Sequence, residues 1–313
     1  MTKQPQPSSQ VVLVTGAGSG IGRVVATVLA RAGHVVYASM RDIASRNRER
    51  AEELLALAGA EALLLDVVEL DVLSEVSCRA ALDQILLERG RIDVVVNNAG
   101  MLMTGVTEAL TPDQVATVID TNALSWLRVN RAAVPAMRRQ GGGTIVYIGS
   151  TTTRIHEPFL GPYVASKAAG DALAEVMSFE LRPFGIDSVI VSPGAFTQGT
   201  EHFAHAHAPR DHAVVRQYGA FPARAAGLPE KLDRIDAAHG GPLDVSAVGA
   251  MVRDVLALAP GRRPFRVTVD AQQKGIEELD TLHEVRQRAF FTQLGVDDLL
   301  PARAGQPPII ERE

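Results

Sequence analysis

Short apolar segments alternate with longer segments of helical periodicity from Val11 to about Val191, and this alternation constrains the fold more than any other feature. The predicted strands are 11–14, 35–38, either 62–65 or 67–70, 92–96, 144–148 and 187–191. Segments that are apolar at every position are typical of strands covered on both faces, as in a parallel sheet. The stretches between them predict helices at 21–31, 43–57, 74–88, 112–138 and 163–181. The pattern predicts an α/β fold, a Rossmann-like doubly wound parallel sheet in a single domain.

The alternation is interrupted after Gly194. Residues 195–241 are rich in Ala, His, Pro and Gly and contain no clear strand pattern, so we interpret them as a lid inserted over the ligand site. A helix at 245–258, a strand at 265–269 and a helix at 277–293 then follow. The predicted organisation is a flexible tail at 1–10, a Rossmann-fold domain at 11–270 and a C-terminal helical extension at 271–313.

Charge and cysteine content exclude several classes of partner. The net charge of −5 provides no positive field to attract nucleic acid or an anionic membrane. The single cysteine, Cys78, cannot form an internal disulfide, which favours the reducing cytoplasm. No apolar run approaches the ~18 residues that span a bilayer, and the polar start of the chain has no signal-peptide core. We therefore expect a cytoplasmic protein with no nucleic-acid or membrane partner.

A glycine-rich turn follows the first predicted strand, with the sequence TGAGSGIG from Thr15 to Gly22. Glycines let the backbone approach a pyrophosphate, and the N-terminus of the following helix offers unpaired N–H groups. The sequence lacks the Lys of a nucleoside-triphosphate loop, and Ile21 stands where G-x-G-x-x-G requires its last glycine. A tight strand–helix turn without a ligand is the alternative. The expected cofactor contacts are Gly16, Gly18, Ser19, Gly20 and Ile21.

The spacing T-G-x-x-x-G-x-G resembles the short-chain dehydrogenase/reductase family, in its short single-domain branch. Further matches to that family occur in order along about residues 11–270: Asn97-Asn98-Ala99-Gly100, Asn122, Ser150, Tyr163-Val164-Ala165-Ser166-Lys167 and Pro193-Gly194. The resemblance implies an NAD(P)-dependent enzyme acting on CH–OH and C=O groups. It also implies cofactor contacts at Asn98, Ala99, Gly100, Pro193 and Gly194.

Tyr163 and Lys167 are four residues apart on one predicted helix, so both project from the same face. A nearby ammonium should lower the pKa of the phenol below its usual ~10, making Tyr163 an acid/base for the substrate oxygen. Ser150 can donate a hydrogen bond to the same oxygen. The resemblance implies that Lys167 also holds the nicotinamide ribose and that Asn122 anchors a water in a proton relay. We expect Asn122, Ser150, Tyr163 and Lys167 to be catalytic.

The end of the second predicted strand bears on the choice of cofactor. Aligned to the family, Met40 stands where NAD-preferring members carry an acid, and Arg41 stands where many NADP-preferring members carry a base. A guanidinium can pair with a 2′-phosphate, so NADP is expected and NAD is less favoured. In the alternative, Arg41 is solvated and Asp42 binds the ribose hydroxyls. Ser19 is neutral where another NADP-binding branch has a base.

Two further cofactor contacts leave alternatives open. Asp71 and Val72 are expected at the adenine, with Asp66 as a competing acid. Thr197 is expected at the carboxamide, where Thr200 is a second candidate and Gln198 occupies the other common position.

The substrate rim is expected at His156 and Phe159, which lie between Ser150 and Tyr163 along the chain. The lid also contains His202, His205, His207 and His212. Histidine is a common metal ligand, but no cysteine joins the cluster and the chemistry requires no metal. We therefore expect a solvated or substrate-facing loop and no metal site.

The resulting hypothesis is an NADP(H)-dependent carbonyl reductase acting on a small, apolar ketone or aldehyde. A 3-oxoacyl-carrier reductase and a non-catalytic dinucleotide-sensing protein are the alternatives, and the intact Ser150, Tyr163 and Lys167 disfavour the second. The resemblance implies a homodimer or homotetramer that pairs through the helices at 111–138 and 163–181.

Overall fold

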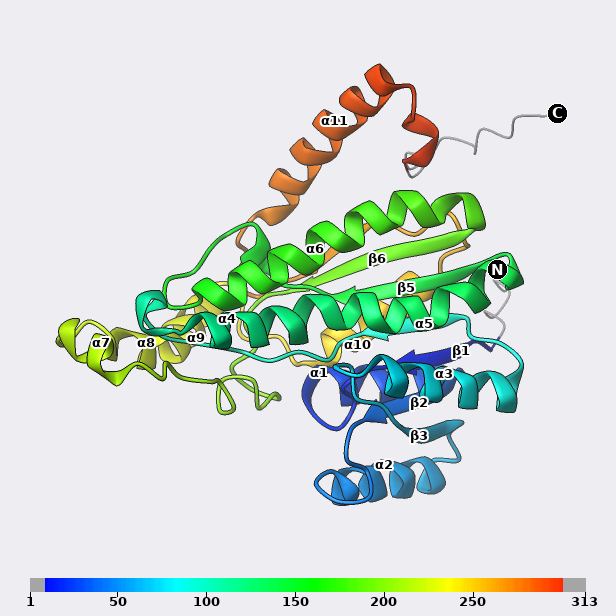
Figure 1. Cartoon of the computed structure of the whole chain (residues 1–313), viewed down its shortest axis with the longest axis horizontal. Helices are drawn as coiled ribbons and strands as arrows, with labels where there is room; N and C mark the ends of the chain where they lie inside the picture. Colours follow the sequence, from blue (N-terminus) through cyan, green and yellow to red (C-terminus); the bar gives the residue numbers. More distant parts are fainter. Residues whose placement is uncertain (1–8, 301–313) are drawn as a thin grey trace.

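All strands of the central sheet are parallel in the computed structural model, which describes residues 9–300 (Figure 1). The strand order is β3-β2-β1-β4-β5-β6-β7 in a 7-stranded sheet. The strands are β1 Val11–Val14, β2 Val35–Met40, β3 Leu65–Glu69, β4 Val94–Asn97, β5 Gly143–Ile148, β6 Ile186–Pro193 and β7 Arg266–Val269. The order reverses between β1 and β4, which creates a crevice for ligands beyond the carboxyl ends of these strands. The predicted Rossmann-like fold is confirmed.

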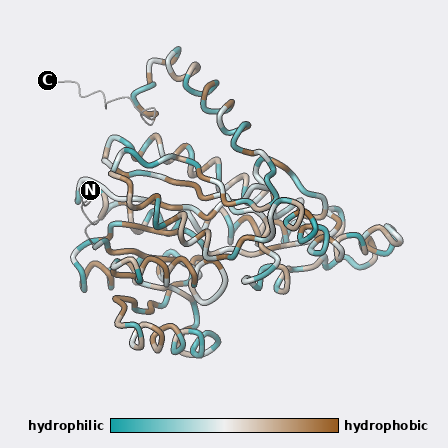
Figure 2. Tube along the Cα trace, turned by 180° about the vertical axis from the view of Figure 1, so that it is seen from behind, coloured by the Kyte–Doolittle hydropathy of each residue, from teal (hydrophilic) through white to brown (hydrophobic). Residues whose placement is uncertain are grey.

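Helices cover both faces of the sheet. One layer contains α1 Gly20–Arg31, α2 Arg48–Ala60 and α10 Ser246–Ala257, and the other contains α3 Glu75–Arg89, α5 Ser125–Gln140 and α6 Gly161–Leu181. In β1, Val12 and Val14 pack against the first layer, whereas Val11 and Leu13 pack against the second. Figure 2 shows the strands as the most hydrophobic part of the trace. Burial on both sides explains why the central strand β1 is apolar at every position, whereas the edge strand β3 carries the exposed Asp66 and Glu69.

Two predicted elements are displaced. The helix expected from residue 43 begins at Arg48, because Asp42 adopts a left-handed conformation with φ 56° and the Glu69 carboxylate accepts from the N–H groups of Asp42 and Ile43 at 2.7 and 2.9 Å. These bonds hold residues 42–47 in a turn. The third strand overlaps both predicted alternatives and coincides with neither.

The helix predicted at 112–138 is divided. Thr111 forms a capping box with Gln114 at the start of α4 Pro112–Ile119. A π-helical turn at Asp120–Leu124 then separates α4 from α5. Such turns widen the helix locally and are frequent at functional sites.

Residues 195–241 add no strand to the described sheet and contain three short helices: α7 His212–Gln217, α8 Ala223–Ala226 and α9 Leu228–Ala238. His207 forms an isolated bridge with Met103 in the loop after β4. The lid is therefore fastened to the loop that follows a central strand. Within residues 9–300, no helix combines the length and apolar character needed to cross a membrane.

The predicted terminal segments are only partly described. Residues 1–8 of the tail and 301–313 of the extension lie outside the described residues. Ser9 and Gln10 hydrogen bond to Gly33 and His34, respectively. The described part of the extension contains the long helix α11 Ile276–Leu294, which lies outside the two helical layers (Figure 1).

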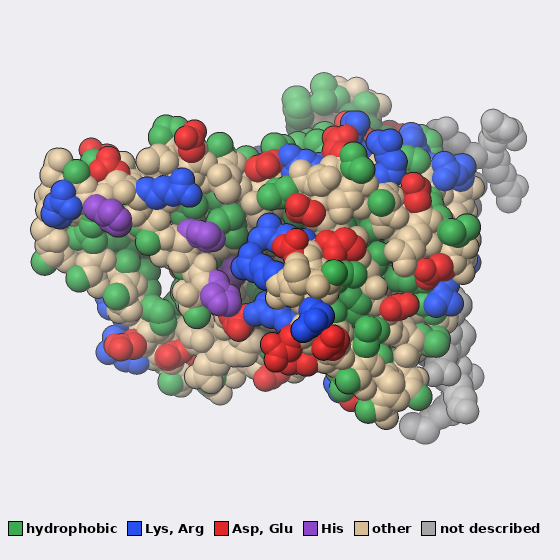
Figure 3. Space-filling model, turned by 60° about the horizontal axis from the view of Figure 1, so that its bottom comes forward, with side chains coloured by type: hydrophobic (Ala, Val, Ile, Leu, Met, Phe, Trp, Pro, Cys, Tyr) green, Lys and Arg blue, Asp and Glu red, His purple; other side chains and the backbone are tan. Residues whose placement is uncertain are grey.

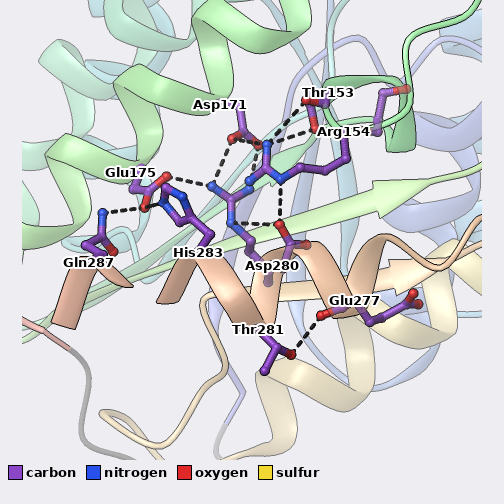
Figure 4. Close-up of polar contacts among 11 residues, drawn as sticks. Thr153, Arg154, Asp171, Glu175, Glu277, Asp280, Thr281, His283 and Gln287 are labelled. Atoms are coloured by element: carbon purple, nitrogen blue, oxygen red, sulfur yellow. Dashed lines mark hydrogen bonds and ion pairs between the residues drawn. The ribbon is translucent and has the colours of Figure 1, made fainter. Parts of the chain in front are cut away.

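Helix α11 contacts α6 and the loop after β5 mainly through polar side chains (Figure 4). The Arg154 guanidinium donates to Asp280 at 2.6 Å, and Glu175 accepts from Gln287 at 2.7 Å. The Glu175 carboxylate also lies 2.8 Å from the His283 ring. The Phe179 and Phe291 rings, with centroids 5.0 Å apart, add one apolar contact. This attachment is a row of charged and amide groups rather than a buried apolar seam.

Candidate active site

Ser150, Tyr163 and Lys167 lie together where β5 ends and α6 begins. All three are buried, with 6, 8 and 5% of their surface exposed. The Ser150 side chain interacts with the Tyr163 phenol, and the Ser150 Oγ also accepts from the Thr152 N–H and hydroxyl at 3.2 and 2.9 Å. The Lys167 ammonium donates to the Ile148 carbonyl oxygen at 2.8 Å. The structure thus brings together three of the four groups that the sequence predicts to be catalytic.

The ionisation of Tyr163 differs from the sequence expectation. Burial raises the pKa of Tyr163 to about 12, and the hydrogen bond with Ser150 opposes this only in part. Burial also lowers the pKa of Lys167 to about 8. The expected net lowering of the Tyr163 pKa is wrong for this structure, because burial of the phenol outweighs the groups that favour the phenolate. The Lys167 ammonium is bonded to Ile148 and lies 5.9 Å from the centre of the phenol ring. A phenol that remains protonated at neutral pH is suited to donate a proton.

Asn122 is completely buried in the π-helical turn. Its Oδ1 accepts from the Met101 N–H at 2.7 Å, and its Nδ2 donates to the Met101 carbonyl and to Ser166 Oγ, both at 2.9 Å. Asn122 thereby connects the loop after β4 to the helix that carries Tyr163. The water-relay role implied by the resemblance stays a prediction.

The glycine-rich turn is held close to the loop after β4. A Cβ at Gly22 would lie 2.3 Å from Asn98 Nδ2 and 2.4 Å from the Gly16 oxygen, so no side chain fits there. Asn98 Nδ2 donates to the carbonyl oxygens of Thr15 and Gly16. Its side chain therefore supports the turn, and the cofactor contact expected of Asn98 stays a prediction. Ser19 makes no side-chain cap, so N–H groups at the start of α1 stay available for a pyrophosphate.

Gln272 shapes the loop that starts the lid, and the sequence analysis missed it. Gly194 has no room for a side chain, since a Cβ would lie 2.1 Å from Asp270 Oδ1. The Gln272 amide accepts from the Ala195 N–H at 2.8 Å and donates to the Ala195 oxygen at 3.1 Å. It also donates to Asp236 of α9 at 2.5 Å. A single Gln after the last strand carries no motif that could have identified it.

The threonines after Gly194 point to different partners. The Thr197 hydroxyl donates to Asp233 of α9 at 2.5 Å, so it is engaged within the lid. Thr200 lies against the glycine-rich turn, with its Cβ 3.7 Å from the position of a Cβ added at Gly20. Thr200 is thus the threonine beside the glycine-rich turn, and the expected contact of Thr197 or Thr200 with the carboxamide stays a prediction.

The acids considered for adenine binding lie at opposite ends of β3. Asp66 is the second residue of the strand. Asp71 and Val72 follow the strand at its carboxyl end, and Asp71 Oδ1 accepts from the Leu73 N–H at 3.0 Å. Only Asp71 and Val72 lie at the ligand edge of the sheet. Arg41 follows β2 with an exposed side chain, 4.0 Å from the Asp42 carboxylate.

A cleft of about 560 Å³ separates the glycine-rich turn and the start of α2 from the lid. The Arg50 guanidinium and the Glu201 carboxylate meet across it at 2.9 Å. Figure 3 shows basic and acidic side chains interspersed beside histidines on the face turned forward. The sequence analysis did not identify Arg50, which lies in a stretch with several arginines and becomes distinctive only through its contacts.

The lid covers one side of Tyr163 with apolar residues. Phe203 and Ala206 pack against the buried cluster of Leu102, Leu160, Tyr163 and Val164. Phe159, at φ 68°, contacts Phe221 of the lid with ring centroids 5.2 Å apart. A positive φ is unusual for a bulky residue, and the Gly105 N–H supports it by donating to the Phe159 oxygen at 2.8 Å. His156, the other predicted rim residue, is exposed.

His202 lies with its ring centroid 5.7 Å from that of Tyr163. The His202 side chain is exposed to solvent, yet desolvation by nearby protein atoms and the Lys167 charge lower its pKa to about 4. His202 is thus a neutral group at the site. Across residues 9–300, no group of three or more His, Cys, Asp or Glu side chains is arranged to hold a metal ion.

Known proteins that are similar in sequence or structure are named dehydrogenases and reductases. The family model for short chain dehydrogenases matches residues 10–210. The chain is 35% identical over 190 residues to 3-ketodihydrosphingosine reductase from Bacteroides thetaiotaomicron, a match covering 61% of this chain and 65% of that protein. It therefore spans less than two thirds of that relative.

Two solved structures show the same fold over more of the chain. A short-chain dehydrogenase from Streptomyces avermitilis is 28% identical, with a TM-score of 0.70 and coverage of 91% of this chain and 96% of that one. A single-residue variant of actinorhodin polyketide ketoreductase with NADPH is also 28% identical, with a TM-score of 0.67 and coverage of 84% and 95%.

Proposed function

Since the chain belongs to the short-chain dehydrogenase/reductase family, we propose that it is an NADP(H)-dependent oxidoreductase that interconverts a ketone or aldehyde with an alcohol. The observation that carries this proposal is the burial of Ser150, Tyr163 and Lys167 together, with the Lys167 ammonium 5.9 Å from the centre of the Tyr163 ring. A protein that only senses a dinucleotide would not require this arrangement.

In the reducing direction, the Tyr163 hydroxyl donates its proton to the substrate oxygen. Ser150 holds that oxygen by a hydrogen bond, and Lys167, fixed on Ile148, supplies positive charge that favours the phenolate left behind. Bound NADPH supplies a hydride to the carbonyl carbon. His202 and the apolar wall limit the water that reaches Tyr163.

The residues at the carboxyl edge fit a dinucleotide. The closely packed glycine-rich turn and the free N–H groups of α1 match a pyrophosphate, and Asp71 and Val72 lie where the adenine is expected. Arg41, with no acid at Met40, supports NADP over NAD. NADPH is present in the related ketoreductase structure, which adds support by analogy.

The apolar cluster of Leu102, Leu160, Val164 and Phe203 beside Tyr163 supports a substrate with an apolar chain or ring. The name of the Bacteroides relative, a keto-lipid reductase, agrees with this. A 3-oxoacyl substrate attached to a carrier is the second candidate, favoured by the likeness to a polyketide ketoreductase.

We further propose a cytoplasmic homo-oligomer that pairs through α5 and α6. The Glu175 and Phe179 side of α6 already contacts α11, so pairing through α6 would use its remaining surface, where Leu173 and Val176 are exposed.

The test is turnover of the purified protein with NADPH and with NADH. The panel contains a long-chain ketone, a steroid ketone, an aldehyde and a 3-oxoacyl thioester. We expect turnover of an apolar ketone with higher kcat/KM for NADPH. Arg41→Ala should lower kcat/KM for NADPH roughly 10- to 100-fold and leave that for NADH nearly unchanged. Binding of a dinucleotide with no turnover of any carbonyl or alcohol would support the sensing alternative.

A further inference from the structure

The ion pair of Arg50 and Glu201 connects the two walls of the cofactor cleft. Arg50 is the third residue of α2, and Glu201 belongs to the lid, 151 residues further along the chain. Their side chains are 38 and 49% exposed and therefore remain accessible to a ligand. The same cleft is lined by Gly18, Ser19 and Gly20 of the glycine-rich turn.

The Arg50 side chain lies against the glycine-rich turn at Gly18. A Cβ added at Gly18 would lie 3.6 Å from Arg50 Cδ and 3.4 Å from Met40 Sδ. Met40 is the last residue of β2, and the adenosine ribose binds just beyond the end of this strand in Rossmann folds. The guanidinium of Arg50 is thus carried by a side chain that passes beside the expected ribose position.

We propose that Arg50 binds the adenosine 2′-phosphate of NADP(H), and that Glu201 occupies Arg50 until the phosphate displaces it. The inference rests on the proposed use of NADP(H). A phosphate presents three acceptor oxygens and more negative charge than a carboxylate, so it competes well for a guanidinium. Arg50 supplies the second base that the neutral Ser19 does not provide.

This arrangement gives the two partners opposite roles. Arg50 attracts the 2′-phosphate, whereas Glu201 competes with it and repels it. If the pair were only a clasp that holds the lid over any dinucleotide, loss of either partner would change binding in the same direction, and NADPH and NADH would be affected alike. The sign of the Glu201 effect therefore distinguishes the two roles.

The experiment measures dissociation constants for NADPH, NADH, 2′,5′-ADP and 5′-AMP by titration of the full-length protein. The variants are Arg50→Ala, Glu201→Gln, Arg41→Ala and Arg48→Ala, and circular dichroism verifies folding. Arg48 is a matched control, because it lies on the same helix with a 71% exposed side chain paired to Glu52. 2′,5′-ADP and 5′-AMP differ only by the 2′-phosphate and do not depend on turnover.

We expect Arg50→Ala to weaken the binding of NADPH and 2′,5′-ADP roughly 10- to 100-fold, as for the loss of one charge-assisted hydrogen-bonding group. The dissociation constants for NADH and 5′-AMP should change less than about threefold. Glu201→Gln should tighten NADPH and 2′,5′-ADP selectively, and Arg48→Ala should match the parent.

Three results would overturn the inference. If Glu201→Gln and Arg50→Ala weaken all four ligands alike, the pair is a lid clasp. If Arg50→Ala binds NADPH as tightly as the parent and Arg41→Ala binds it more weakly, Arg41 alone recognises the phosphate. The proposed function would then still hold. A parent that binds NADH more tightly than NADPH would instead contradict the proposed cofactor itself, and this inference with it.

Discussion

The Lys167 ammonium donates a hydrogen bond to the main-chain oxygen of Ile148 at 2.8 Å. This bond connects the second turn of α6 to the last residue of β5. The ammonium also lies over the Trp126 ring, 5.4 Å from its centre, and such contacts favour a cation. Lys167 is therefore fixed in position while its burial makes the charged form costly. Both properties suit a cation that must respond to a change of charge at Tyr163.

Replacing Tyr163 by Phe should preserve NADPH binding and reduce kcat by about 10²–10⁴, because only the proton donor is removed. Tyr147→Phe is the control, since Tyr147 is buried in the core and hydrogen bonds to Asn130. That change should lower the free energy of unfolding by roughly 1–3 kcal/mol and leave kcat close to the parent value. Near-normal kcat in Tyr163→Phe would exclude Tyr163 as the acid.

The lowered pKa of Lys167 predicts a pH-dependent stability. Lys167 titrates at about 8 in the folded protein and at about 10.5 when unfolded, so between these values the unfolded chain binds more protons. Stability relative to a Lys167→Met variant should thus rise between pH 8 and 10.5, by roughly 1–3 kcal/mol. Urea unfolding of both proteins at a series of pH values measures this difference. A difference that is constant or falls with pH would mean that Lys167 is not desolvated in the fold.

Gly22 and Gly59 both lie in helices and should respond oppositely to alanine. A Cβ at Gly22 would overlap Asn98 and the Gly16 backbone, whereas nothing lies within 4 Å of a Cβ at Gly59. Gly22→Ala should cost about 1–3 kcal/mol of stability and weaken NADPH binding. Gly59→Ala should be stabilising by roughly 0.5–1 kcal/mol. Thermal unfolding measures the stability of both variants, and NADPH titration measures their cofactor binding. Equal stability and equal NADPH binding in the two variants would show that the turn can relax around a side chain at residue 22.

Gln272→Ala should release the start of the lid, because it removes the bonds to Ala195 and Asp236. Amide hydrogen exchange should become faster in residues 195–200 and in α9, while β1 and β4 keep their protection. In the parent protein, cofactor and substrate together should slow exchange across 195–241. Exchange that is uniformly slow in the ligand-free parent would identify the lid as a fixed wall.

The sequence predicts those parts of the fold that depend on neighbouring residues. Strands buried on both faces, the glycine-rich turn and the Tyr163–Lys167 spacing are all local patterns. The turn at 42–47 is not, since it depends on Glu69 of another strand. The Arg50–Glu201 and Gln272–Asp236 contacts require knowledge of the path of the lid, which has no repeating pattern. The direction of the Tyr163 pKa depends on burial, which spacing does not reveal.

The polar attachment of α11 makes the C-terminal extension sensitive to ionic strength in a way that the sheet is not. The sheet is held by apolar burial, which concentrated salt does not weaken. The contacts of Asp280 and His283 with the body are charge-dependent, and salt screens such partly buried groups less than exposed pairs but more than it affects apolar contacts. Concentrated chloride salt should therefore loosen α11 before it affects the sheet, so the surface of α6 that lies beneath α11 becomes accessible or covered according to the electrolyte around the protein.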